Sequence, residues 1–170
     1  HGVRYPYMTG AMANGIAAAE IVIAMGKAGM LGSFGAAGLS VDKVDQNITR
    51  IQQELGGLPY CVNLIHSPGE PRIEQAVMEL FLKRGVRLIE ASAYLALTPM
   101  LVQYRLTGLT RGANGHVVAR NRIIGKVSRR EVAAMFMNAA PAQMVAELVA
   151  QGKVTAEEAE LSKELSLIHI

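Results

Sequence analysis

The stretch PYCVNLIHSPGEPRIEQAVMELFLKRGVRLIEA, residues 59–91, decides the fold class. Its apolar run at 59–65 is typical of a strand buried on both faces, and the run at 86–91 predicts a second such strand. Between them, apolar residues recur at the spacing of one helix face until Gly85 ends the helix. Two strands joined by a helix indicate parallel pairing with a right-handed crossover.

The same alternation of strand and helix continues on both sides of this stretch. Five strand–helix units in one chain indicate a parallel α/β fold. Two architectures fit: an open doubly wound sheet, complete at this length, and a (β/α)8 TIM barrel, of which five units are only the N-terminal portion. Strands are expected at 3–8, 30–33, 59–65, 86–91 and 122–127, helices at 16–26, 41–55, 68–84, 99–106, 130–137, 142–151 and after 155, and a hairpin around 112–115.

The two ends of the chain favour a barrel that is truncated at its C-terminus. The chain starts at His1 rather than Met and is apolar almost at once. Its last six residues, LSLIHI at 165–170, look like the translated end of a sequencing adaptor, with a genuine terminal strand as the alternative. We therefore expect residues 1–164 to be the N-terminal part of a single domain and residues 165–170 to be a non-native tail.

Composition excludes several classes of function. Hydrophobic residues make up 51% and charged residues 18% of the 170, which is too apolar for disorder. No apolar run approaches the roughly 20 residues that span a bilayer. The net charge of +3 is small, its basic residues are dispersed, and there is no Trp, so a nucleic-acid surface is not expected. The single cysteine, Cys61, excludes an internal disulfide and suits a cytoplasmic protein.

Ligands of parallel α/β proteins bind at the carboxyl ends of the strands. There, the loop MTGAMANG at 8–15 has small side chains that would let a flat ligand approach the backbone, unless they only allow tight packing. Asn63 is a polar residue in an apolar strand, and its amide must bond either backbone or a ligand. Glu90 needs a donor or cation, for which Lys126 is a candidate, although Lys126 could instead contact an anionic ligand. His66 is either structural or an acid–base group.

Several familiar site patterns are missing from the sequence. Glycines recur at every third position from Gly26 to Gly38, but they do not form the GxGxxG dinucleotide fingerprint, and there is no GxxxxGK[ST] loop. The histidines are scattered and the cysteine stands alone, so no metal site is expected. There is no GxSxG elbow for an esterase and no carboxylate cluster for a glycosidase.

Five stretches of sequence closely resemble the PfaD family, the FMN-dependent enoyl reductases of polyunsaturated fatty acid and trans-acyltransferase polyketide synthases. The resemblance covers essentially all of residues 2–164. The stretches are YPYMTGAMANGIA (5–17), GSFGAAGL (32–39), NLIHSP (63–68), EASAY (90–94) and GKVSR (125–129).

The resemblance implies a nitronate monooxygenase-like (β/α)8 barrel that holds FMN at its strand ends. It implies reduction of enoyl thioesters on an acyl-carrier-protein-bound chain, with NAD(P)H as reductant and synthase subunits as partners. By resemblance, Met8 and Thr9 pack their backbone against the flavin ring, Asn63 and Lys126 reach the cofactor, and Ala91 lies near the isoalloxazine. A lysine there would stabilise negative charge on reduced flavin.

The chain departs from the family in one respect. The Gly-Gly-His motif and the glycine-rich phosphate loops of the family's later strands do not occur in these 170 residues. The catalytic residue is therefore unknown, and this fragment alone is expected to bind FMN poorly and to be inactive. Two other interpretations remain open: a nitronate monooxygenase-like flavoenzyme, and a non-catalytic α/β binding or scaffold domain.

Overall fold

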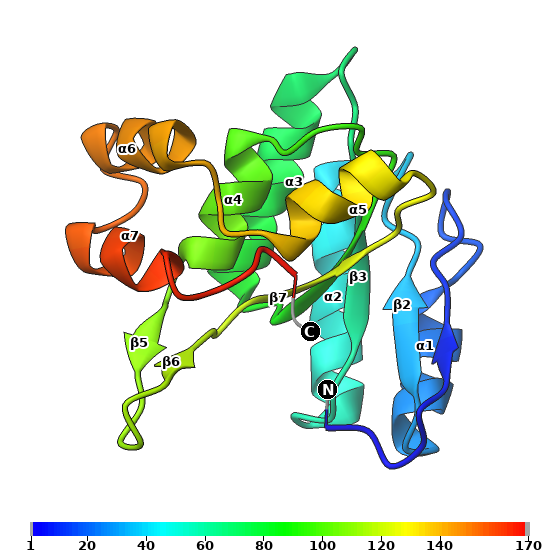
Figure 1. The fold of residues 1–170 in the computed structure, drawn as a ribbon. Coiled ribbons are helices and arrows are strands. Elements are labelled where there is room, and N and C mark those ends of the chain that lie inside the picture. The colour runs from blue at the N-terminus through cyan, green and yellow to red at the C-terminus, as the bar shows by residue number, and fades with distance from the viewer. Residues whose placement is uncertain (1, 169–170) are drawn as a thin grey trace. The chain divides into compact units, whose positions relative to one another are not determined.

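The computed structural model describes residues 2–168, whose contacts divide into two compact units, His1–Ser92 and Ala93–Ile170 (Figure 1). The first unit carries a parallel sheet and its connecting helices, and the second carries mainly helices. The single domain expected over residues 1–164 stays a prediction.

In the first unit, strands and helices alternate along the chain, and this part is coloured blue to green in Figure 1. Its strands lie side by side in chain order, and each neighbouring pair is parallel. A doubly wound sheet would reverse its strand order at a switch point, whereas a barrel keeps it, so the observed order is that of a TIM barrel's N-terminal portion. The elements are β1 (Met8–Thr9), α1 (Ala19–Lys27), β2 (Leu31–Phe34), α2 (Val41–Leu55), β3 (Cys61–Ile65), α3 (Pro71–Arg84) and β4 (Leu88–Ser92).

Helix α2 illustrates how local sequence sets these elements. Ser40 caps it, since its Oγ accepts a hydrogen bond from Lys43 N at 3.4 Å. Gly56 ends it in the left-handed conformation, at φ 54°. Its apolar stripe is buried, as the spacing predicts. The stripe consists of Val44, Ile48, Ile51 and Leu55.

The structure differs from the expected elements at two places in the first unit. The strand expected at 3–8 is reduced to β1, because Arg4 N and Tyr5 N both donate to the single carbonyl of Gly29, which bends the chain away from a ladder. The helix expected at 68–84 begins only at Pro71: Ser67 and Glu70 have the spacing of a capping box, but no side-chain cap is present.

The second unit contains α4 (Pro99–Leu106), the hairpin of β5 (Thr110–Arg111) and β6 (Val117–Val118), β7 (Arg122–Gly125), α5 (Arg130–Met137), α6 (Ala142–Ala150) and α7 (Ala156–Ser162). Thr98 caps α4, since its side chain accepts a hydrogen bond from Leu101 N, and a reciprocal capping box of Thr155 and Glu158 begins α7. The hairpin is also confirmed. Ser128 and Glu131 have the spacing of a capping box, but none forms, because the N-cap of α5 is Arg129 and makes no side-chain bond.

Buried polar side chains tie the second unit together. Arg105 donates from Nη1 to Asn121 O at 2.8 Å and from Nε and Nη2 to Ser166 O, both at 3.2 Å. Asn121 Nδ2 donates to Tyr104 O and Thr107 O. Burial lowers the pKa of Arg105 to about 10, so its guanidinium still carries a proton at neutral pH.

No single helix within residues 2–168 is long and apolar enough to cross a bilayer. Helices α5 and α6, which meet at a bend of 55°, pass that test only when counted together.

Candidate functional site

Two loops at the carboxyl end of the first unit's sheet are joined, or fastened, by backbone hydrogen bonds. They are the β1–α1 loop, residues 10–18, and the β2–α2 loop, residues 35–40. A Cβ at Gly35 would lie 1.7 Å from Met12 O, so only glycine permits this approach. The fastened loops form one platform with little freedom. The bonds are Asn14 N to Ala37 O (2.7 Å), Gly15 N to Gly35 O (3.0 Å) and Gly35 N to Ala17 O (2.9 Å).

Strands β3 and β4 bring a buried amide to the same end of the sheet. Asn63 pairs in register with Glu90, and it is only 5% exposed. Its Nδ2 donates to Glu90 O at 3.0 Å and to Ser92 Oγ at 2.9 Å. Among residues 2–168, no donor lies within hydrogen-bond distance of Asn63 Oδ1. The Nδ2 atom of Asn63 therefore bonds protein groups, while its Oδ1 atom remains available to accept a hydrogen bond from another group.

Glu90 reaches from β4 to the β1–α1 loop. Its side chain is 1% exposed, and Oε2 accepts a hydrogen bond from Ala11 N at 3.0 Å. The sequence predicted that this buried carboxylate needs a donor, and a backbone N–H supplies one. The bond joins residues 79 positions apart.

The predicted site residues of the first unit lie on three strands of one sheet, β1, β3 and β4. Met8 and Thr9 make up β1, and Thr9 Oγ1 is buried with no hydrogen-bond partner among the described residues. Ala91 is buried in β4 and pairs with Leu64. Because side chains alternate along a strand, its methyl lies on the opposite face from Glu90, so Ala91 offers the Asn63 face only its backbone.

Lys126 belongs to the second unit. It follows directly after β7, and its side chain is exposed. The structure therefore brings Met8, Thr9, Asn63 and Ala91 together in one sheet and leaves the contact of Lys126 with a cofactor a prediction.

A histidine–carboxylate pair lies beside these residues and was not predicted. His66 Nδ1 is 3.0 Å from Glu74 Oε2, which also accepts from Ser67 N at 2.8 Å. The Glu74 side chain is 1% exposed. A carboxylate there orients the imidazole and fixes its tautomer. The pair could have been suspected from the sequence because Glu74 is a charged residue among the apolar positions of a helix.

A cavity of about 280 Å³ opens next to Asn63. Its walls are the β2–α2 loop, the end of β3 and the start of α3, and its polar lining includes Asn63, Ser67 and Glu74. Among the described residues, no lysine or arginine lines it, so no cationic side chain there would attract an anion. The cavity suits a neutral polar group instead.

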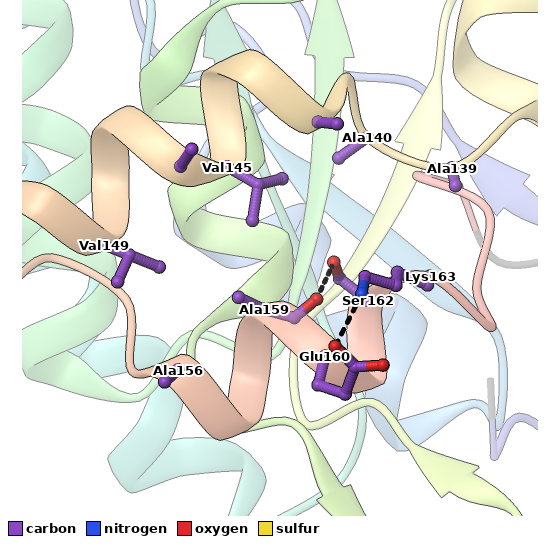
Figure 2. Close-up of a pocket in the computed structure, with 11 residues that line it drawn as sticks. Ala139, Ala140, Val145, Val149, Ala156, Ala159, Glu160, Ser162 and Lys163 are labelled. Atoms are coloured by element: carbon purple, nitrogen blue, oxygen red, sulfur yellow. Dashed lines mark hydrogen bonds and ion pairs between the residues drawn. The ribbon is translucent and has the colours of Figure 1, made fainter.

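The second unit has a groove of different character, lined mostly by alanine and valine (Figure 2). It has a volume of about 460 Å³. Val145 and Val149 of α6 form one wall, and Ala156 and Ala159 of α7 form the other. Its polar side chains bond neighbours on their own helix, since Ser162 Oγ donates to Ala159 O and Lys163 pairs with Glu160. The groove therefore offers apolar surface rather than reactive groups.

Other reactive groups are not set up for chemistry. Burial raises the pKa of the Cys61 thiol, which keeps it protonated and poorly nucleophilic. No three side chains of His, Cys, Asp or Glu gather as metal ligands within residues 2–168.

No protein-family model matches the chain, but several known proteins do. One of the polyunsaturated fatty acid synthase subunits of Thraustochytrium is 52% identical over 163 residues, which cover 96% of this chain and 11% of that protein. Polyketide biosynthesis protein PksE of Bacillus subtilis is 44% identical over 158 residues, 92% of this chain and 21% of that protein. A probable nitronate monooxygenase of Staphylococcus saprophyticus is 45% identical over only 62 residues, 36% of this chain and 17% of that protein.

The same relationship holds in three dimensions. The crystal structure of the enoyl reductase domain of MlnA, from the macrolactin biosynthesis cluster of Bacillus amyloliquefaciens, has 39% identity and a TM-score of 0.95. The structural match covers 98% of this chain and 38% of the MlnA chain. The chain spans about a fifth or less of the curated relatives it matches. These relatives confirm the resemblance seen in the sequence: the chain belongs to the PfaD-like family, whose members include parts of polyunsaturated fatty acid synthases and polyketide biosynthesis proteins.

Proposed function

We propose that this protein is part of an FMN-dependent enoyl reductase that acts on acyl-carrier-protein-bound enoyl thioesters, with NAD(P)H as reductant. The likeness to an enoyl reductase domain supports the reaction class. The observation that supports the cofactor is the combination, at one end of the sheet, of a small-residue loop with two acceptors that have no donor among the described residues. These acceptors are Thr9 Oγ1, which is buried, and Asn63 Oδ1.

The residues at this end of the sheet fit a flavin. Its isoalloxazine is flat and carries N–H and carbonyl groups along one edge. Asn63 Oδ1 would accept from a ring N–H, and the Thr9 hydroxyl can donate or accept. Met8 and Ala91 would contact the ring through backbone, and the Lys126 cation would stabilise negative charge on reduced flavin. When bound, FMN would carry a hydride from NAD(P)H to the enoyl carbon chain.

The partners follow from the proposed substrate. The acyl chain would arrive on an acyl carrier protein, and the enzyme would act together with other synthase subunits in the cytoplasm. The relatives in synthases support this setting.

The direct test is to purify the full polypeptide that carries this sequence and to record its visible spectrum. We expect a flavin spectrum that NAD(P)H bleaches and that an enoyl-acyl carrier protein restores without oxygen. Acid release followed by chromatography would separate FMN from other flavins. A colourless protein that does not take up added FMN would contradict the proposal and favour a non-catalytic binding or scaffold role.

A second candidate is nitronate oxidation, which the 62-residue match to a nitronate monooxygenase favours. It shares the flavin and differs in substrate. Oxygen consumption with an alkyl nitronate, compared with reoxidation by the enoyl thioester, separates the two activities.

Substitution of Gly10 tests whether the open loop contacts the cofactor. A Cβ at Gly10 would meet no atom within 4 Å, so Gly10→Ala should unfold at the same denaturant concentration as the wild type. If the ring packs on this backbone, the methyl should weaken FMN binding by about tenfold, measured by fluorescence titration. Gly69→Ala, equally unhindered and outside the proposed contact, is the control. Equal FMN affinity in both variants would place the ring elsewhere.

A further inference from the structure

We propose that Glu90 is a positioning residue that holds the β1–α1 loop in place for the cofactor. This inference rests on the flavin function proposed above. Ala11 lies beyond the last ladder pair of β1, Thr9 with Gly32, so the sheet does not fix its backbone. The Oε2 atom of Glu90 does so instead, at 3.0 Å from Ala11 N.

A buried carboxylate is a strong acceptor for this purpose. Glu90 is 1% exposed, so its bond to Ala11 N is shielded from water, and a hydrogen bond in such surroundings is stronger than one exposed to solvent. Because burial penalises an unbonded N–H or carboxylate, the loop and β4 stabilise each other's polar groups. The bond holds the start of the loop at Ala11, while three backbone bonds to the β2–α2 loop hold residues 14–17.

The backbone of Glu90 makes a second link. Its carbonyl accepts the hydrogen bond from Asn63 Nδ2, at 3.0 Å, which leaves Asn63 Oδ1 available. Glu90 thus bonds two parts of the proposed site, the β1–α1 loop through its side chain and the Asn63 amide through its backbone. A change at Glu90 should therefore alter cofactor binding although Glu90 need not contact the cofactor itself.

The test compares Glu90→Ala and Glu90→Gln in the full polypeptide. The Gln side chain keeps an acceptor oxygen for Ala11 N, whereas Ala removes it. Glu79→Ala is the matched control, because Glu79 is exposed on α3 and bonds only Gln75 among the described residues. Two quantities are measured for each: amide hydrogen exchange of the peptide that contains Ala11, without flavin, and the affinity for added FMN.

We expect Glu90→Ala to exchange faster at Ala11 and to bind FMN at least about tenfold more weakly, with Glu90→Gln close to the wild type in both. Unchanged exchange in Glu90→Ala, or a Gln variant as defective as the Ala variant, would overturn the acceptor role. Faster exchange with unchanged FMN affinity would reduce Glu90 to a structural residue and overturn the proposal. If the wild type itself takes up no FMN, the proposed function fails, while the exchange data still report on the Glu90–Ala11 bond.

Discussion

Both units of this chain bury polar side chains, but they use them differently. In the second unit, Arg105 and Asn121 donate to carbonyls of the helix, turn and terminal segment around them. In the first unit, Asn63 and Glu90 bond across strands to the backbone at the sheet's carboxyl end, and Asn63 Oδ1 still lacks a donor among the described residues. Burial of a polar residue alone therefore does not indicate a site. An acceptor left open at a strand end is the better sign.

The largest expected effect is on the fastened loops of the first unit. Gly35→Ala would place a methyl 1.7 Å from Met12 O, a backbone atom that cannot move aside without breaking the bonds between the loops. We expect a loss of about 3 kcal/mol in the free energy of unfolding, measured by urea denaturation. Gly69→Ala, with no atom within 4 Å of its Cβ, should unfold like the wild type. Equal stability of both variants would mean that the loops are not in contact.

An intermediate effect is expected from the polar core of the second unit. Arg105→Met keeps an apolar side chain of similar length but leaves the carbonyls of Asn121 and Ser166 without their donor. We expect a loss of about 2 kcal/mol in the free energy of unfolding and no direct loss of FMN affinity. Arg111→Met, which removes an exposed ion pair with Glu164 and an exposed hydrogen bond to Gly115 O, is the control and should change little. Weaker FMN binding by a folded Arg105→Met variant would show that the buried polar side chains of the second unit also affect the cofactor, which would contradict the proposed difference between the units.

The smallest effect concerns an exposed ion pair of the first unit. Arg84 donates to both carboxylate oxygens of Asp45, and this hydrogen bonding lowers the pKa of Asp45 below its ordinary value of 3.8. A depressed pKa stabilises the fold above that ordinary value and ceases to do so as the pH falls through the lowered one. Asp45→Asn should therefore lose little at neutral pH and show a shallower fall in the urea midpoint as the pH drops from about 5 to below 3.8. An unchanged acid slope would show that the pair contributes nothing.

Local features of the fold were predictable, and contacts between distant residues were not. Ser40 and Gly56 bound α2 because caps and left-handed glycines act within one turn. The strand expected at 3–8 failed because its pattern carries no information about Gly29, whose carbonyl bends that segment.

The candidate site follows the same division. Asn63 could be recognised from the sequence as an amide within a buried apolar strand, and the structure confirms that its side chain is buried. The partner of Glu90 could not be predicted, because a backbone N–H leaves no trace in the sequence. The His66–Glu74 pair was missed because its eight-residue spacing matches no capping pattern and depends on how the turn before α3 is made.

The fastening of the β1–α1 and β2–α2 loops has a consequence for how this protein can diversify. An insertion or deletion between residues 10 and 14 would displace the rest of the β1–α1 loop relative to Gly35. The three backbone hydrogen bonds that join the two loops would then no longer align. Changes of length are tolerated far better at the exposed hairpin tip, residues 112–115. We expect descendants of this chain to acquire new substrates through such outlying segments while the platform is inherited at fixed length.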